Sequence, residues 1–394
     1  MTPGRPIYLD HHATTPCDPR VVEAMMPWWT ERFGNAASTT HVYGREAARA
    51  VEEARAEVAA LVGADPREIV FTSGATEALN LALKGLAAGR PGGGGPGREA
   101  GPARVVASAS EHTAVLDVLK GPAFAPELVA PTPGGIVEPD AIAAALARAP
   151  ALAVAVMAAN NEVGTVQPVS AIAEVARAAG AFMVCDAAQV AGKLPFDVRA
   201  LGVDLAAISA HKLNGPKGVG ALIVRRRRGE APLPLAPLIE GGGHERGLRS
   251  GTLPVPLIVG FGAAARLARG ALVEEAIRVA ALRDRLWAGL RAGLGERVVR
   301  TGGEGAPRLP GNLHVALPGI EARRLLERMP ELALSAGSAC TSADLSPSHV
   351  LVAMGLSDRH VYGSLRFGVG RGTTEAEIDR AIAVLVAAVE RIGE

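Results

Sequence analysis

The chain has 394 residues, of which 48% are apolar and 21% are charged, a composition typical of globular proteins. It is long enough to bury a large core and to hold two domains. Its net charge of +1 gives no strong electrostatic field, which argues against nucleic acid or an acidic membrane as a partner.

The sequence also argues against a membrane protein and a metal centre. The best candidate for a membrane span is Ala151–Ala159, which the polar Asn160 interrupts. It is shorter than the roughly 18 residues that a spanning helix needs. The N-terminal segment Met1–Asp10 has no apolar signal stretch, so we expect a soluble, cytoplasmic protein. No CxxC pair is present, and neither a zinc site nor a disulfide framework is predicted from the cysteines, which are Cys17, Cys185 and Cys340.

The first elements predicted along the chain are three helices and a strand. Asp18-Pro19 provides an N-cap and a first turn for a helix over Arg20–Arg32. Arg45–Val62 has the apolar stripe of a second helix, which Gly63 ends. A short apolar strand, Ile69–Thr72, then leads into a turn of small residues and a helix that ends near Ala87.

Strands and helices then alternate. We predict strands at Arg104–Ser108, Ala151–Ala158, Phe182–Cys185 and Leu205–Ser209, and helices at Thr113–Lys120, Asp140–Arg148 and Val169–Ala179. This alternation requires crossover connections and predicts a mainly parallel sheet that is buried on both faces. Gly218–Val224 follows the last strand too closely for a helical crossover, so it is predicted to be an antiparallel neighbour.

The remaining segments differ from this alternating region in composition or in the elements that they predict. Gly89–Ala103 is dense in Gly and Pro and is predicted to be a flexible surface loop with no assigned function. The arginine run Arg225–Arg228 is interpreted as a solvated strand end, with RNA contact as the alternative. Beyond about Arg266, a long helix over Leu272–Leu294 and strands near Asn312–Leu317 and Ser364–Val369 indicate a second, smaller domain.

Three polar features at strand ends predict a pyridoxal phosphate site. Lys212 follows a strand, where ligands of open α/β sheets bind, and its amine could form a Schiff base. Asp186 ends another strand, where a pyridinium nitrogen would partner a buried carboxylate. Gly74-Ala75-Thr76 opens a helix, whose free N–H groups favour a phosphate. A surface lysine, a turn-capping aspartate and an ordinary helix start are the alternatives, and only the combination makes the prediction specific.

Four further side chains could complete such a site. His112 could stack on a planar cofactor and exchange protons, or simply begin a helix. Gln189, about a turn after Asp186, could donate to the ring oxygen of the cofactor. Arg366 could bind a substrate carboxylate in bidentate fashion, or lie on the surface. Cys340 lies among small residues, where an exposed thiol could act as a nucleophile, although most cysteines are buried and inert.

Motifs along nearly the whole chain support this interpretation: Tyr8–Asp10, Ala13–Pro16, Phe33–Asn35, Phe71–Glu77, Glu111-His112, Asn160–Gly164, Asp186–Gln189, Ser209–Lys212, Gly241–Thr252, Ser335–Ala343 and Arg366. In combination they resemble the NifS/IscS-type cysteine desulfurases, which are class V aminotransferase-like, fold-type I pyridoxal phosphate enzymes. The resemblance implies a mainly parallel seven-stranded sheet sandwiched by helices. It also implies a large cofactor-binding domain at 16–266, and a smaller α/β domain at 1–15 and 267–394 that carries the Cys340 loop.

The resemblance implies a role for each matching residue. Lys212 resembles the lysine that carries the cofactor, Asp186 the pyridinium partner, and Gln189 and Asn161 contacts to the ring oxygen and the substrate side. His112, within the matching Glu111-His112 motif, is our candidate for proton exchange with the substrate. A phosphate cup is implied for Ala75, Thr76, Ser209 and His211, and Thr252 resembles the residue that reaches the phosphate of the other subunit, which implies a homodimer. Asn35 and Arg366 resemble the pair that binds the substrate carboxylate.

The implied activity is the removal of sulfur from L-cysteine, which gives L-alanine and a persulfide on Cys340. The persulfide would be handed to a sulfur acceptor or an Fe–S scaffold protein. A selenocysteine lyase and another class V aminotransferase stay open as alternatives, and so does a catalytically idle protein with this fold. No resident metal is implied, beyond an Fe–S or sulfur hand-off at Cys340.

Overall fold

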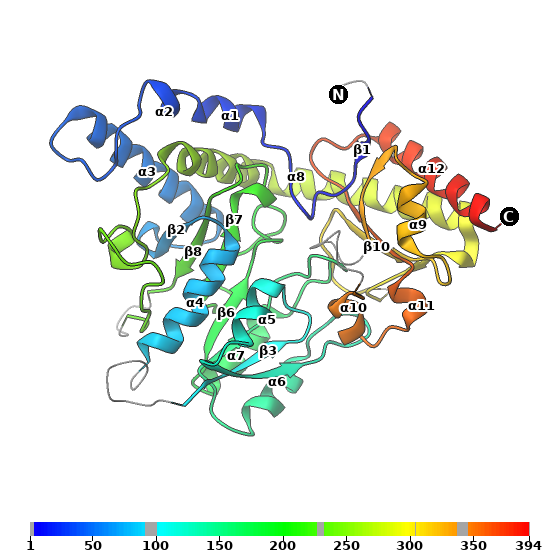
Figure 1. Ribbon diagram of the computed structural model, residues 1–394, viewed down its shortest axis with the longest axis horizontal. Coiled ribbons are helices and arrows are strands. Elements are labelled where there is room, and N and C mark those ends of the chain that lie inside the picture. The colour runs from blue at the N-terminus through cyan, green and yellow to red at the C-terminus, as the bar shows by residue number, and fades with distance from the viewer. Residues whose placement is uncertain (1–3, 91–100, 227–231, 304, 337–345, 394) are drawn as a thin grey trace.

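A computed structural model describes residues 4–90, 101–226, 232–303, 305–336 and 346–393 (Figure 1). Most of the predicted Gly89–Ala103 loop and the end of the arginine run therefore lie outside the described residues. Within the described ranges the strands form sheets of seven, four and two strands.

The seven-stranded sheet is mainly parallel, as the sequence predicts. Its spatial order is β2 (Ile69–Thr72), β8 (Gly220–Val224), β7 (Leu205–Ser209), β6 (Phe182–Asp186), β5 (Ala153–Ala155), β3 (Ala103–Ser108) and β4 (Phe124–Val129). Among these described strands only β8 runs opposite to the others, and it pairs with both β2 and β7. The predicted antiparallel neighbour is thus confirmed, and so is the fold class.

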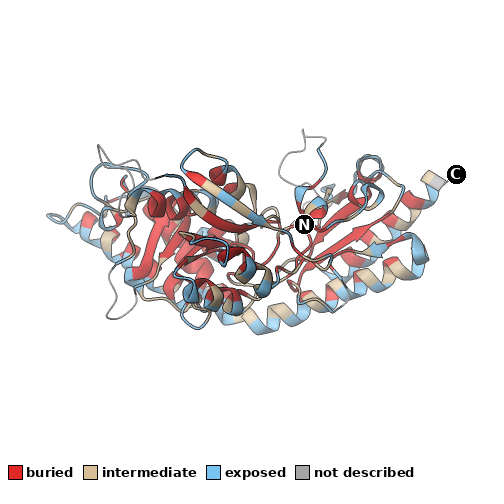
Figure 2. Ribbon diagram, turned by 90° about the horizontal axis from the view of Figure 1, so that it is seen from below, coloured by how far each residue is buried: buried red, intermediate tan, exposed pale blue. Residues whose placement is uncertain are grey.

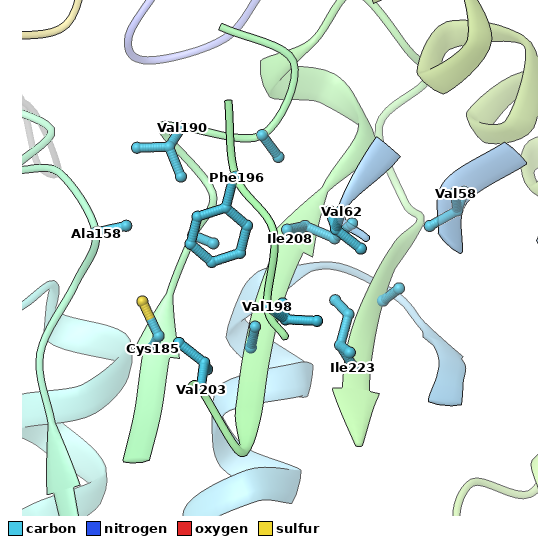
Figure 3. Packing of buried hydrophobic residues seen from close by; sticks show 14 of the residues in the cluster. Val58, Val62, Ala158, Cys185, Val190, Phe196, Val198, Val203, Ile208 and Ile223 are labelled. Carbon is cyan, nitrogen blue, oxygen red and sulfur yellow. The ribbon is translucent and has the colours of Figure 1, made fainter. Parts of the chain in front are cut away.

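Side chains alternate between the two faces of this sheet and bury both. Leu205 and Ala207 of β7 join one apolar core, which the helices α4 (Ala75–Gly89) and α5 (Thr113–Leu119) cover. Ala206 and Ile208 join the opposite core. Figure 3 shows Ile208 among the residues of this core. That core is covered by α3 (Val42–Leu61), α6 (Pro139–Leu146), α7 (Val169–Ala178) and the first half of α8 (Val255–Leu294).

A smaller antiparallel sheet lies at the other end of the molecule. Its order is β12 (Ser335–Ala336), β13 (Ser364–Gly368), β10 (Asn312–Ala316) and β9 (Val299–Arg300). A separate apolar core joins this sheet to the second half of α8 and to α9 (Ala322–Glu327) and α12 (Glu375–Gly393). The N-terminal strand β1 (Ile7–Tyr8) pairs with β11 (Leu332–Ala333). The short helices α10 (His349–Ala353) and α11 (Asp358–Val361) precede β13. Figure 2 shows that the strands are mostly buried, whereas the outer faces of the helices are exposed.

Helix α8 is much longer than the predicted helix at Leu272–Leu294. It begins at Val255 and runs for 40 residues, so position 266 lies inside it. Small residues dominate its first half, where Cβ atoms at Gly260 and Gly262 would lie 2.5–2.6 Å from Met25 and Ala54. This half is surrounded by protein and therefore lacks the amphipathic stripe that identifies a surface helix.

Helix α8 also has the length and composition of a membrane span. The core helix of a soluble protein can have the same length and composition. The first part of α8 packs against α3 and supplies Ile258, Phe261 and Ala264 to the apolar core.

Two further predicted elements are divided or shortened in the structure. The helix predicted over Arg20–Arg32 is two helices, α1 (Pro19–Met25) and α2 (Pro27–Thr30). Pro27 has no N–H group and its ring crowds the preceding turn, so it starts a new helix. The strand predicted at Ala151–Ala158 is confined to β5, although Ala158 still donates a hydrogen bond to the carbonyl of Asp186.

Candidate active site

A cavity of about 550 Å³ opens at the carboxyl ends of the central strands. It is lined by ten of the predicted site residues: Ala75, Thr76, His112, Asn161, Asp186, Gln189, Ser209, His211, Lys212 and Arg366. These residues come from distant parts of the chain. The sheet collects them because parallel strands end at one edge.

The Lys212 amine lies on the wall of this cavity. Lys212 ends a short 3-10 helix, η2 (Ala210–Lys212), that follows β7 directly. Its Nζ donates to the backbone carbonyls of His12 at 2.6 Å and Ala13 at 2.8 Å. The N-terminal segment is held in place there by Thr15, whose hydroxyl donates to the carbonyl of His211 at 2.8 Å.

Asp186 and His112 are two titratable groups of this cavity; Asp186 ends β6, and His112 follows β3, with β5 between the two strands. Burial raises the pKa of Asp186, while His112, the Ala188 N–H and Lys212 oppose that rise. The Ala188 N–H donates to Asp186 Oδ1 at 2.9 Å. His112 caps α5 by accepting the Ala114 N–H at 3.1 Å, and burial lowers the pKa of its ring. His112 is therefore both a helix cap and a cavity residue.

The turn before α4 is shaped to receive an anion. Gly74 takes the N-cap position with φ of 159°, and no side chain caps this end of α4 among the described residues. The helix dipole and the open N–H groups of the first turn favour a phosphate there. Strand β8 passes closely behind, since a Cβ on Gly220 would lie 2.7 Å from the Cα of Gly74.

Arg366 reaches the cavity from β13 and is almost completely buried. Its Nη2 pairs with the Asp10 carboxylate at 2.7 Å, and its Nη1 donates to the carbonyl of Asn161 at 3.0 Å. Ser335 also donates to Asp10, at 2.9 Å. Asp10 therefore fixes the guanidinium, a role that the sequence pattern did not predict.

The predicted pairing of Asn35 with Arg366 is not found within the chain. Asn35 is exposed, does not line the cavity, and accepts the Ala37 N–H at 2.9 Å. It follows α2, at the end of the molecule remote from the small sheet that carries Arg366 (Figure 1). Proximity in the chain to α1 and α2 decides this placement, because these helices pack on α8.

Two further predicted residues lie outside the cavity or outside the described chain. Thr252 is exposed and does not line the cavity. Cys340 lies outside the described residues. The described flanks of its segment contact the site region: Ser335 donates to Asp10, and Ser348 donates to the buried carboxylate of Glu162.

The cavity also contains residues that the sequence analysis did not assign. His12, Ala13 and Thr14 line it, and the carbonyl groups of the first two bind Lys212. Ala13 and Thr14 belong to the N-terminal motif of the resemblance, which assigned them no contact, and no sequence signal pointed to His12. Within the described ranges no group of three His, Cys, Asp or Glu side chains is arranged to hold a metal ion.

Comparisons with known proteins decide the family. The model of the aminotransferase class-V family matches residues 7–381. The chain belongs to this family.

Class-V relatives are similar over the full length of the chain. "Cysteine desulfurase IscS" of Anaeromyxobacter sp. (strain Fw109-5) is 50% identical over 99% of this chain and 94% of its own length. The solved structure of a NifS-like protein has 34% identity and a TM-score of 0.85, and covers 98% of this chain and 99% of that one. The structure "SspA in complex with cysteine" has 33% identity and a TM-score of 0.76, and it covers 92% of this chain and 98% of that one.

Class-V enzymes of this kind depend on pyridoxal phosphate, and the cavity fits that group. Its volume lies in the range of small-molecule sites. The uncapped start of α4 offers a phosphate position, and Lys212 offers an amine. The Asp186 carboxyl, buried with a raised pKa, is the group that a pyridinium nitrogen would stabilise in its charged form.

Proposed function

We propose that the protein is a pyridoxal phosphate-dependent cysteine desulfurase, which removes sulfur from L-cysteine and releases L-alanine. The observation that carries this proposal is the shared cavity of Lys212, Asp186 and the Gly74–Thr76 turn. The relatives support the choice of substrate, since one is named a cysteine desulfurase and another is described in complex with cysteine.

Several residues of the cavity would hold the cofactor. Lys212 would bind its carbonyl carbon, Asp186 its ring nitrogen and Gln189 its ring oxygen, while His112 would stack on the ring. The phosphate would lie against Ala75, Thr76, Ser209 and His211, and Thr252 would reach the phosphate of a second subunit. When bound, the cofactor supplies an electron sink for bond cleavage at the substrate Cα.

The protein groups around the substrate have distinct tasks. Arg366, fixed by Asp10, would bind the substrate carboxylate beside Asn161. The second contact to this carboxylate would be Asn35 of another subunit. The Lys212 amine would take the Cα proton, and His112 would exchange protons with the substrate.

Sulfur transfer would take place at Cys340. Its thiolate attacks the substrate sulfur, so that an S–S bond forms as the substrate C–S bond breaks, and the carbon product gains protons to leave as alanine. A persulfide remains on Cys340 for a sulfur acceptor or an Fe–S scaffold protein.

We also propose a cytoplasmic homodimer. The thiols of Cys17 and Cys185 are free, as in proteins of reducing compartments. Residues 16–266 would form the cofactor-binding domain, and 1–15 with 267–394 the smaller one. Helix α8 contributes to the apolar cores around the seven-stranded and the four-stranded sheets.

Two substitutions test the function directly. The purified protein should be yellow, and Lys212→Ala should lose the absorbance of the bound cofactor, whereas Lys120→Ala on the surface should keep it. Cys340→Ser should abolish sulfide release from L-cysteine and leave the cofactor bound. Mass spectrometry of Cys340 after incubation with L-cysteine should find one added sulfur.

Other outcomes of these experiments point elsewhere. Full desulfuration by Cys340→Ser would remove this thiol from the mechanism. Faster turnover of selenocysteine than of cysteine would indicate a selenocysteine lyase, and dependence on a keto acid would indicate an aminotransferase.

A further inference from the structure

A second lysine lies directly behind the wall of the cofactor cavity. Lys193 Nζ donates to Gln189 Oε1 at 3.2 Å, from one turn further along the chain. Lys193 does not line the cofactor cavity itself, but a small neighbouring cavity shared with His11, His12 and Glu275. Gln189 lines the cofactor cavity, so it lies between Lys193 and the cofactor position.

Two groups with fixed hydrogen-bonding character determine which way the Gln189 amide points. An ammonium can only donate, so the amide atom that faces Lys193 must be the oxygen. A backbone carbonyl can only accept, so the amide atom 3.0 Å from the His12 carbonyl must be the nitrogen. The two requirements agree, and a reversed amide would violate both.

The same argument determines the tautomer of the neighbouring His12 ring. Gln189 Oε1 also lies 3.1 Å from His12 Nδ1, so Nδ1 must carry the proton. His12 is buried, and burial lowers its pKa well below the ordinary value because it disfavours the charged ring. Repulsion from the nearby Lys193 lowers the pKa further. The ring is therefore neutral, and one amide oxygen accepts from two donors.

We propose that Lys193 is a positioning residue that holds the Gln189 amide with its nitrogen toward the cavity, as a donor to the cofactor's ring oxygen. The inference rests on the proposed function and deepens it. An amide nitrogen has two hydrogens, and the His12 carbonyl accepts one, which leaves the second for the cofactor. A cation on Oε1 also polarises the amide and strengthens its N–H as a donor.

The surroundings of Lys193 define the conditions of a test. The charged groups that act on it are Lys212, Arg366 and Glu275, and the neutral rings of His11 and His12 share its small cavity. Burial, followed by repulsion from Lys212 and Arg366, lowers the pKa of Lys193 to about 7. Binding is therefore best measured at about pH 6, where the ammonium is formed.

The test measures pyridoxal phosphate affinity on the apoprotein by absorbance. Lys193→Met removes the donor at similar length, and we expect a roughly 3- to 10-fold weaker affinity, since the His12 carbonyl still holds the amide in part. Lys193→Arg keeps an obligate donor and should restore most of the affinity. Lys120→Met removes a surface ammonium as the matched control and should change nothing.

A double-mutant cycle separates this role from a merely structural one. If Lys193 acts through Gln189, Lys193→Met should weaken binding in the wild type but not further in Gln189→Ala. The absorbance maximum of the bound cofactor should also shift in the same direction in both single variants. Equal losses in both backgrounds, or no loss at all, would overturn the inference.

Failure of the proposed function would look different. In that case the wild-type apoprotein itself would not bind pyridoxal phosphate. Should Lys193→Met not fold, as judged by circular dichroism, Lys193→Gln takes its place: it removes the charge, and the same non-additivity with Gln189→Ala is expected.

Discussion

At the scale of single residues, the Asp186 carboxyl gives the most direct electrostatic prediction. Asp186→Asn preserves the shape and the acceptor for the Ala188 N–H but cannot carry a charge. We expect cofactor affinity to fall by roughly 2–3 kcal/mol, the worth of a hydrogen bond to a charged group. Titration of the apoprotein with pyridoxal phosphate measures this loss. Asp117→Asn, an exposed change on α5, is the control, and equal affinities for both variants would contradict the pairing.

Glu162 gives a prediction about pH. Burial raises its pKa to about 7, although Ser348 and Arg366 oppose the rise. The folded protein therefore binds a proton that the unfolded chain has already released, and the stability from this group is lost as the pH rises through about 7.

Glu162→Gln should remove this dependence, because glutamine imitates the protonated acid. Between pH 5 and pH 8, as rough limits around that pKa, the variant should lose less unfolding free energy than the wild type, by at most about 3 kcal/mol. Unfolding midpoints at both pH values test this, with the exposed Glu31→Gln as the control. A parallel loss in wild type and variant would show that Glu162 does not titrate in this range.

Residues at strand ends were predictable, and residues placed by long-range wrapping were not. Lys212, Asp186 and Gln189 follow their strands so closely that the sheet alone brings them together. His12 reaches Lys212 only because the N-terminal segment crosses the molecule, and no local pattern encodes this path. Asn35 lies outside the cavity of its own chain because the path of α1 and α2 places it, which no local pattern encodes either.

At the scale of elements, the close passage of β8 behind the phosphate turn predicts a strict requirement for glycine at position 220. A Cβ there would lie 2.5 Å from the Ile208 carbonyl and 2.7 Å from the Gly74 Cα. Gly220→Ala should cost about 1–3 kcal/mol of stability and also weaken cofactor binding, because the turn must shift.

Gly270→Ala is a matched control for this change. Gly270 lies in α8 with no atom near its Cβ position, so alanine should stabilise the helix by up to about 1 kcal/mol. Chemical unfolding of both variants tests the pair. Equal effects would mean that the contact behind the turn relaxes freely.

Elements were predictable where the local pattern decides the outcome. Strand β4 was missed because it contains Pro126, which is tolerated only at a sheet edge, where β4 lies. The break between α1 and α2 at Pro27 could have been predicted from that residue. The start of α8 could not, because a helix enclosed by protein has no polar face to reveal it.

At the scale of the whole molecule, exposed apolar side chains predict association. Met26, Trp29 and Phe33 are each more than half exposed, and Phe33 stacks on the partly exposed Tyr43 with ring centres 5.4 Å apart. A patch of this kind around α1 to α3 is typical of a subunit interface.

We expect light scattering to give twice the 40.3 kDa of one chain. Phe33→Asp should shift the protein toward the monomer, because it puts a charge into the apolar patch. Leu128→Asp, on the edge strand β4, replaces another exposed apolar residue and should not. A monomeric wild type would refute the homodimer.

Helix α8 has a thermodynamic consequence for the molecule. This one continuous helix of about 60 Å supplies side chains to the apolar cores around the seven-stranded and the four-stranded sheets. Unfolding of either core would unwind part of α8 and expose the other core. The two cores should therefore share one melting temperature. A calorimeter should therefore record a single heat-absorption peak. Two resolved peaks would mean that α8 breaks in the middle and that the two cores unfold separately.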